Sequence, residues 1–273
     1  MASPRLVPRT FKVALVNQKG GVGKSTTTVN LACSLAQMGA RVLVRDLDPQ
    51  ANTTVALAPA EYQYTMNDVL RIQEETGEVV EGCIGSAIVK AGPKWPSGLY
   101  IVPANLLQAD REYDQAVGRE QRLRVASMGG VLDAFDVVID DCPPAVGQLT
   151  VNALTDDDLA LIVTEPERWA LQGVHQVRRT IRRVNQYYNP RLAFGGIIVN
   201  AMFANRVEHK TRLAELHDGF PGEIWDPVIK DIEVIRKAIG AASPLSAYGN
   251  EAAEPMAIYD GFGRRVLDYA LAA

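Results

Sequence analysis

The chain has 273 residues, of which 47% are hydrophobic, and a formal net charge of −4 at pH 7. This length and apolar content suit one large α/β domain with a buried core, and the overall acidity argues against a general nucleic-acid coat protein. Three cysteines without Cys-x-x-Cys spacing disfavour a zinc site or a disulfide framework, and the sequence has no apolar run of about 18 residues that could span a membrane.

Short apolar runs alternate with helical patterns along the chain. Strands are expected at residues 11–16, 42–44, 99–103, 137–139, 159–163 and 196–199, and a helix at 26–38. Such strands, separated by helices, indicate parallel β-α-β units buried on both faces. We therefore predict an α/β fold with a doubly wound, mostly parallel sheet flanked by helices. Residues 1–10 are expected to be an N-terminal tail and 11–273 a single domain, with a helical excursion and a loop at 59–98.

A glycine-rich loop follows the first predicted strand and opens the first helix. It consists of Gly20, Gly21, Val22, Gly23, Lys24, Ser25 and Thr26. Glycines let backbone N–H groups point at a phosphate, and the helix N-terminus adds a partial positive charge. In loops of this class the lysine reaches the β- and γ-phosphates and the serine hydroxyl ligates Mg²⁺. The sequence therefore predicts a fold of the P-loop NTPase type and a nucleotide triphosphatase with ATP and Mg²⁺ as cofactors.

Acidic residues follow the second and fourth predicted strands. These are Asp46 and Asp48 in one place and Asp140 and Asp141 in the other. Carboxylates beside a triphosphate would repel it unless Mg²⁺ or water lies between them, so we interpret them as metal-shell or water-orienting groups. An apolar strand that ends in aspartate is a Walker B pattern. The residues alone leave this role open between Asp140 and Asp141.

The segment Lys19–Thr28 resembles the deviant Walker A motif of the ParA/MinD family of ATPases. The acidic segments 46–52 and 135–144 are similar to the switch I and Walker B motifs of that family, and the resemblance runs from about Phe11 to Tyr269. It implies a homodimer formed with ATP, in which Lys19 crosses the interface and contacts the partner subunit's nucleotide. Spacing alone would equally allow Lys19 to be a solvated loop lysine.

The resemblance also implies roles for the other polar residues. Asp48 would position the attacking water, and the family register selects Asp141, with Ser25, to hold Mg²⁺. Asp140 then occupies a slot that is normally apolar. Asn200 would read adenine, although an asparagine at a strand end is otherwise a turn former. The expected catalytic residues are Lys19, Lys24 and Asp48.

A basic segment lies in the C-terminal half. From Arg168 to Arg212 there are nine basic residues and one acidic residue, Glu208, giving a charge of +8. Its arginines at 178, 179, 182 and 183 recur at helical spacing, which is typical of either a DNA-binding patch or a solvated helix face. Any DNA binding should be to phosphates and independent of sequence. The candidate DNA contacts are Arg206, Lys210, Arg212, Arg236 and Lys237.

On this resemblance we expect a cytoplasmic, nucleoid-associated ATPase that partitions plasmids or chromosomes. Its ATP dimer would bind DNA non-specifically and be released when a ParB-type activator stimulates hydrolysis. The alternatives are a MinD-like membrane switch or a ParA-like positioning ATPase for a protein cargo. The C-terminal residues 259–273 hold one arginine pair and two acidic residues, which predicts a packing helix and no stable membrane association.

Overall fold

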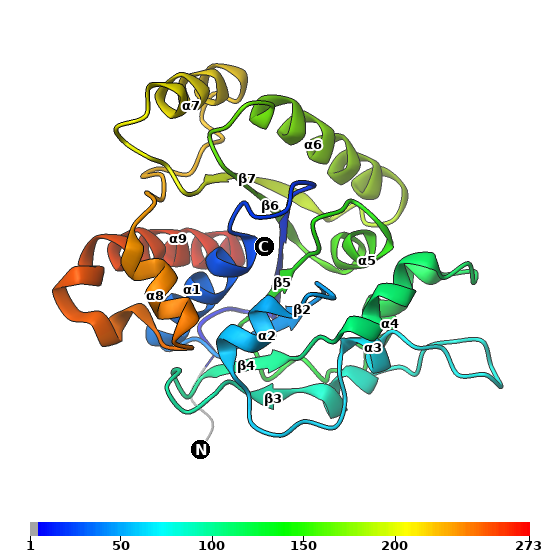
Figure 1. The fold of residues 1–273 in the computed structure, drawn as a ribbon. Helices are drawn as coiled ribbons and strands as arrows, with labels where there is room; N and C mark the ends of the chain where they lie inside the picture. Colours follow the sequence, from blue (N-terminus) through cyan, green and yellow to red (C-terminus); the bar gives the residue numbers. More distant parts are fainter. Residues whose placement is uncertain (1–4) are drawn as a thin grey trace.

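The structure is a computed structural model that describes residues 5–273. Its centre is one seven-stranded sheet with the order β3-β4-β2-β5-β1-β6-β7 (Figure 1). All neighbouring strands are parallel except β3 and β4, which pair antiparallel. The strands are β1 (Phe11–Val16), β2 (Val42–Asp46), β3 (Val89–Lys90), β4 (Leu99–Val102), β5 (Val137–Asp141), β6 (Leu159–Thr164) and β7 (Ala193–Val199).

Helices cover both faces of the sheet (Figure 1). They are α1 (Lys24–Gln37), α2 (Asn52–Leu57), α3 (Met66–Val69), α4 (Arg122–Ala126), α5 (Gln148–Asp156), α6 (Ala170–Tyr187), α7 (Val207–Gly219), α8 (Glu233–Gly240) and α9 (Ala253–Ala272). Successive strand residues point to opposite faces, so Val13 and Leu15 pack in the core beside α1, α8 and α9, whereas Ala14 and Val16 pack beside α4, α5 and α6. The predicted doubly wound α/β fold is therefore confirmed.

One strand and several element boundaries differ from the sequence prediction; β7, for example, begins at Ala193 rather than at residue 196. The edge strand β3 was missed inside the 59–98 segment, because two residues carry no periodicity. The first helix begins at Lys24 rather than at Thr26. Strands β2 and β5 each extend two residues beyond their apolar runs, through charged residues that are fully buried. Those charges have partners within the protein, which allows the strands to continue.

The described residues before β1 and the last helix both pack against the domain. Residues 1–4 of the predicted tail lie outside the described residues, whereas the Leu6 backbone N–H donates to Asp136 Oδ1 at 2.8 Å. Helix α9 packs on α1, where Ser34 Oγ donates to Asp260 Oδ1 at 2.6 Å. The prediction of a C-terminal packing helix is confirmed. Within residues 5–273 no helix is both long and apolar enough to span a membrane.

Candidate nucleotide-binding site

The predicted loop and acidic residues meet at the carboxyl ends of β1, β2 and β5. The loop and Asp48 border a cleft of about 630 Å³, whose lining includes Gly20, Lys24, Ser25, Asp48 and Pro144. A cleft at this edge is where doubly wound sheets bind ligands, and its size falls in the range of small-molecule sites. The parallel register places Asp46 of β2 directly opposite Asp141 of β5.

The conformation of the glycine loop requires its glycines. Gly21 and Gly23 both have φ of +80°, where a residue with a Cβ is strained. A Cβ on Gly23 would also lie 1.7 Å from Nδ2 of Asn200. That amide donates a hydrogen bond to the Val22 carbonyl at 3.1 Å. The structure thus places Asn200 directly behind the loop, and its predicted contact with adenine stays a prediction.

Lys24 is a buried ammonium group without an ion pair among the described residues. Its side chain comes from the first turn of α1 and is 6% exposed. The Lys24 Nζ donates a hydrogen bond to the backbone carbonyl of Lys19 at 3.5 Å. Burial lowers the pKa of Lys24, and the charges of Asp141 and Asp48 oppose that shift. A buried cation with so little compensation fits a site whose charge balance is completed by a bound anion.

Asp141 faces the loop. Its Oδ2 accepts a hydrogen bond from Thr53 Oγ1 at 2.7 Å, and the Ser25 side chain is near enough to lower the pKa of this carboxyl. Its Oδ1 is buried and has no hydrogen-bond partner. Burial raises the pKa of Asp141 to about 6. A buried carboxylate oxygen without a partner beside a serine hydroxyl is a donor set that Mg²⁺ accepts.

Asp46 and Asp48 differ in their surroundings. Both oxygens of Asp46 are used within the protein: Oδ1 accepts from the Asp48 N–H at 3.2 Å, and Oδ2 accepts from Thr54 N–H and Oγ1 at 2.8 and 2.7 Å. Asp46 therefore holds the loop that carries Asp48. Burial raises the pKa of Asp48, while the Gln50 N–H bond and the Lys24 charge oppose it. Asp48 lines the cleft.

Asp140 points to the opposite face of the sheet from Asp141. There it forms a bidentate pair with Arg45, with Nε–Oδ1 and Nη2–Oδ2 distances of 2.6 and 2.8 Å. Arg45 also donates to Asp156 Oδ2 at 2.7 Å and Asp157 Oδ1 at 2.9 Å, both at the end of α5. The side chains of Arg45, Asp140 and Asp157 are fully buried. We call these four residues the Arg45 cluster.

The Arg45 cluster contains more negative than positive groups. Lys12 adds one cation through a 2.7 Å bond to Asp156, which leaves three carboxylates against two cations. Although burial opposes ionisation, Arg45 and Lys12 hold the pKa of Asp156 below its ordinary value. Burial and the nearby Asp140 raise the pKa of Asp157, whose Oδ2 has no partner. Arg45 thus ties strands β2 and β5 to α5, directly behind Asp46 and Asp141.

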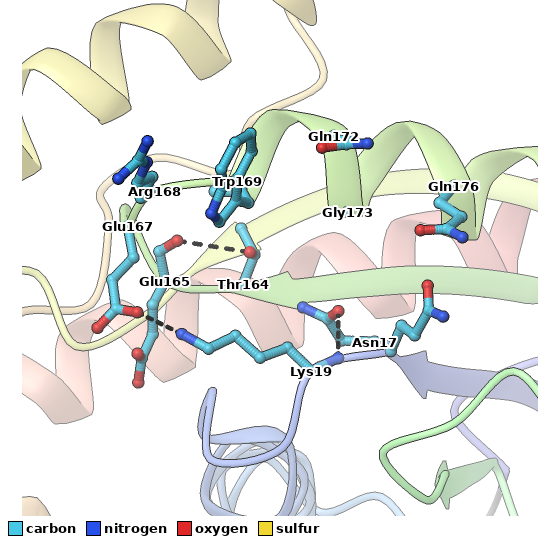
Figure 2. Close-up of a pocket in the computed structure, with 12 residues that line it drawn as sticks. Asn17, Lys19, Thr164, Glu165, Glu167, Arg168, Trp169, Gln172, Gly173 and Gln176 are labelled. Atoms are coloured by element: carbon cyan, nitrogen blue, oxygen red, sulfur yellow. Dashed lines mark hydrogen bonds and ion pairs between the residues drawn. The ribbon is translucent and has the colours of Figure 1, made fainter.

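Lys19 lies at the other side of the loop, where it forms an ion pair with Glu167 (Figure 2). Both side chains are about half exposed. The Lys19 backbone N–H donates to Asn17 Oδ1 at 3.0 Å. These residues border a pocket of about 380 Å³ next to Trp169, which is 66% exposed. The Lys19 ammonium therefore lies at the surface, paired with Glu167.

The candidate DNA contacts have varied surroundings. Arg212 pairs with Glu215, Arg236 with Asp231, and Lys237 with Glu233 and Glu251. Arg206 stacks on the Phe203 ring, 3.8 Å from its centroid. Lys210 forms no ion pair within residues 5–273. The structure does not bring these five side chains into one unpaired patch.

Sequence reasoning did not find the Arg45 cluster or Glu167. A signal for the cluster was present, since Arg45 interrupts an apolar strand just as Asp140 does. Two opposite charges in buried strands suggest a pair. No comparable signal marked Glu167, which is 148 residues from Lys19.

The fold and the glycine loop together define a P-loop nucleotide-binding protein. A family model described as an AAA domain matches residues 10–194. The chain is 33% identical over 240 residues to the sporulation initiation inhibitor protein Soj of Bacillus subtilis, covering 86% of this chain and 90% of Soj. It is 33% identical over 242 residues to the chromosome partitioning protein ParA of Caulobacter vibrioides, covering 86% of each.

A solved structure agrees with this assignment. Cobyrinic acid a,c-diamide synthase from Mycobacterium smegmatis, with bound ADP and magnesium, matches with a TM-score of 0.73 and 30% identity over 93% of each chain. The chain belongs to the ParA family, as its motifs predicted.

Proposed function

We propose that the protein is a partition ATPase. It binds ATP with Mg²⁺, dimerises, holds DNA without sequence preference, and releases it when a ParB-type activator stimulates hydrolysis. The observation that carries the proposal is the buried Lys24 ammonium, which has no ion pair of its own and lies at the glycine loop near Asp141 and Asp48. The name of the chromosome partitioning protein ParA of Caulobacter vibrioides supports the partition role. The proposed location is the nucleoid in the cytoplasm.

The residues of the cleft fit ATP and Mg²⁺. Backbone N–H groups of Gly20–Gly23 and the Lys24 ammonium would hold the phosphates. Ser25 and the unpartnered Oδ1 of Asp141 would hold Mg²⁺. When bound, Mg²⁺ would neutralise charge on the phosphates. Asn200, fixed behind the loop, remains the proposed adenine contact.

Two residues would promote hydrolysis. Asp48 would orient the attacking water and accept its proton, since its carboxylate lines the cleft and only part of its hydrogen-bonding capacity is taken by the Gln50 N–H. Lys19 would leave Glu167 and stabilise the transition-state charge at the partner subunit's nucleotide. Its surface position in this single chain is compatible with such a role in trans.

Asp48→Ala should slow hydrolysis by about 100-fold or more while changing ATP affinity little, because the variant loses the group that orients and deprotonates water. With ATP it should collect as a dimer on gel filtration and stay on DNA longer than the original protein. The control is Asp110→Ala, which removes an exposed carboxylate elsewhere. Hydrolysis by Asp48→Ala at the original rate would contradict the assigned role.

Lys19→Ala should bind ATP as a monomer but lose about 1000-fold or more in hydrolysis, by analogy with an arginine finger. Mixing it with Lys24→Ala tests the action in trans. A mixed dimer has one site in which one chain supplies Lys24 and the other supplies Lys19, so part of the activity should return. Normal hydrolysis by Lys19→Ala, or no recovery on mixing, would show that Lys19 does not act across the interface.

A further inference from the structure

Helix α6 has an apolar face and a basic face. Val174, Val177, Ile181 and Val184 are buried against the sheet side of the helix. The 18 residues Ala170–Tyr187 include four arginines and no acidic residue. At 100° per residue the outer face carries Arg179, Arg182 and Arg183, all exposed. Figure 1 shows α6 at the outside of the molecule, beside α7.

One arginine of α6 has a structural role. Both Nη atoms of Arg178 donate to Glu223 at 2.7 Å. Its guanidinium also lies 4.9 Å from the ring centroid of Phe194 and 5.6 Å from that of Phe220. Arg178 thus anchors α6 to neighbouring elements, and its charge is compensated within the chain.

The other three arginines have no such compensation. Within residues 5–273, Arg179, Arg182 and Arg183 form no ion pair and stack on no aromatic ring. They lie three and four residues apart, a spacing at which like charges on a helix repel each other. Arg179 and Arg182, with His175 and Arg178, line a surface hollow of about 340 Å³. The basic face therefore offers a concave site to an anion, and an anion would relieve the repulsion.

We propose that the Arg179–Arg182–Arg183 face of α6 is a contact surface for the phosphate backbone of duplex DNA. This inference rests on the proposed DNA binding, and it assigns that binding to a particular surface of the protein. Guanidinium groups bind phosphates with two parallel hydrogen bonds, and Arg179 to Arg183 covers about 6 Å of helix axis. A membrane-bound helix would need bulky apolar residues on its exposed face, whereas those of α6 are buried in the core.

The surface does not overlap the nucleotide site. Helix α6 begins beside the Lys19–Glu167 pair, and the arginine face lies about two and a half to three and a half turns further along. ATP and DNA can therefore be bound at the same time. A dimer would carry two such faces, and simultaneous contact by both would raise the apparent affinity.

The experiment compares two triple variants that each remove three positive charges. One is Arg179→Gln/Arg182→Gln/Arg183→Gln on α6; the matched control is Arg71→Gln/Lys90→Gln/Arg124→Gln, at exposed positions on other elements. Binding to two unrelated 30-base-pair duplexes is measured with ATP and Mg²⁺ over a range of salt. The α6 variant should bind both duplexes about tenfold or more weakly, with a log–log salt slope shallower by about 2.7 for each face in contact. The control should bind like the original protein.

Several results would overturn the inference. They are unchanged binding by the α6 variant, an equal loss in the control, or binding of the original protein to anionic phosphatidylserine vesicles but not to DNA. If Arg206→Gln/Lys210→Gln loses DNA binding and the α6 variant does not, the DNA-binding surface lies at α7. In that case the proposed function is retained and only the assignment to α6 is wrong. If the original protein binds no DNA with ATP at low salt, the proposed function falls with the inference. Thermal unfolding and nucleotide affinity of both variants verify that they remain folded.

Discussion

Replacing Arg45 by methionine is expected to lower the free energy of unfolding by about 3–5 kcal/mol, the usual loss when one partner of a buried ion pair is removed. Arg45 is fully buried and donates to Asp140, Asp156 and Asp157. Without it, Lys12 is the remaining cation for three buried carboxylates. Urea unfolding of the nucleotide-free protein measures the effect as a lower midpoint.

A multiple variant distinguishes lost charge balance from lost packing. Arg45→Met/Asp140→Val/Asp156→Ala/Asp157→Ala replaces the whole Arg45 cluster by apolar groups, and such replacements are often neutral or stabilising. It should therefore recover most of the stability that Arg45→Met loses. The exposed Arg71 provides the control, since Arg71→Met should stay within about 0.5 kcal/mol of the original. If Arg45→Met is as stable as the original protein, the cluster is not a stabilising unit.

Lys24→Ala is expected to weaken ATP binding by about 2–5 kcal/mol, or roughly 30-fold to several thousand-fold in Kd, the range for losing one partner of a buried charged contact. Lys24 is 6% exposed and has no ion pair among residues 5–273. Removing it should therefore cost the nucleotide-free protein little stability. Titration calorimetry with ATP and Mg²⁺ measures the affinity.

The control for this variant is Lys90→Ala, which removes an exposed lysine from the edge strand β3. It should bind ATP as the original protein does. Near-normal ATP affinity in Lys24→Ala would contradict the assignment of the loop. A variant that has lost both affinity and stability would indicate that Lys24 instead supports the fold.

The phosphate loop could be predicted because all its information is local. Residues 20–25 are contiguous, and the strand before them and the helix after them are adjacent in sequence. The strands could be predicted for a similar reason, because a strand that is buried on both faces of a sheet is a continuous apolar run in the sequence. Asp141 could be separated from Asp140 by family register, and the structure places Asp141 beside Ser25 and Asp140 beside Arg45.

The long-range pairs could not be predicted in this way. Arg45 meets Asp140 across 95 residues, and Lys19 meets Glu167 across 148. Nothing in either local sequence specifies which distant residue is the partner. Two pairs, in contrast, could have been anticipated from helical spacing: Arg212 lies three residues before Glu215, and Lys237 lies four after Glu233.

The exposed indole beside Lys19 gives this corner of the molecule an optical label. Of the three tryptophans, Trp95 and Trp225 are buried, and Trp169 is 66% exposed. Indole emission depends on the polarity and charge of its surroundings, and the Arg168 guanidinium lies 4.9 Å from the Trp169 ring centroid. Any closure of a second chain over Lys19 also covers this ring. Intrinsic fluorescence can therefore test the proposed dimerisation at this corner in real time, without an attached dye.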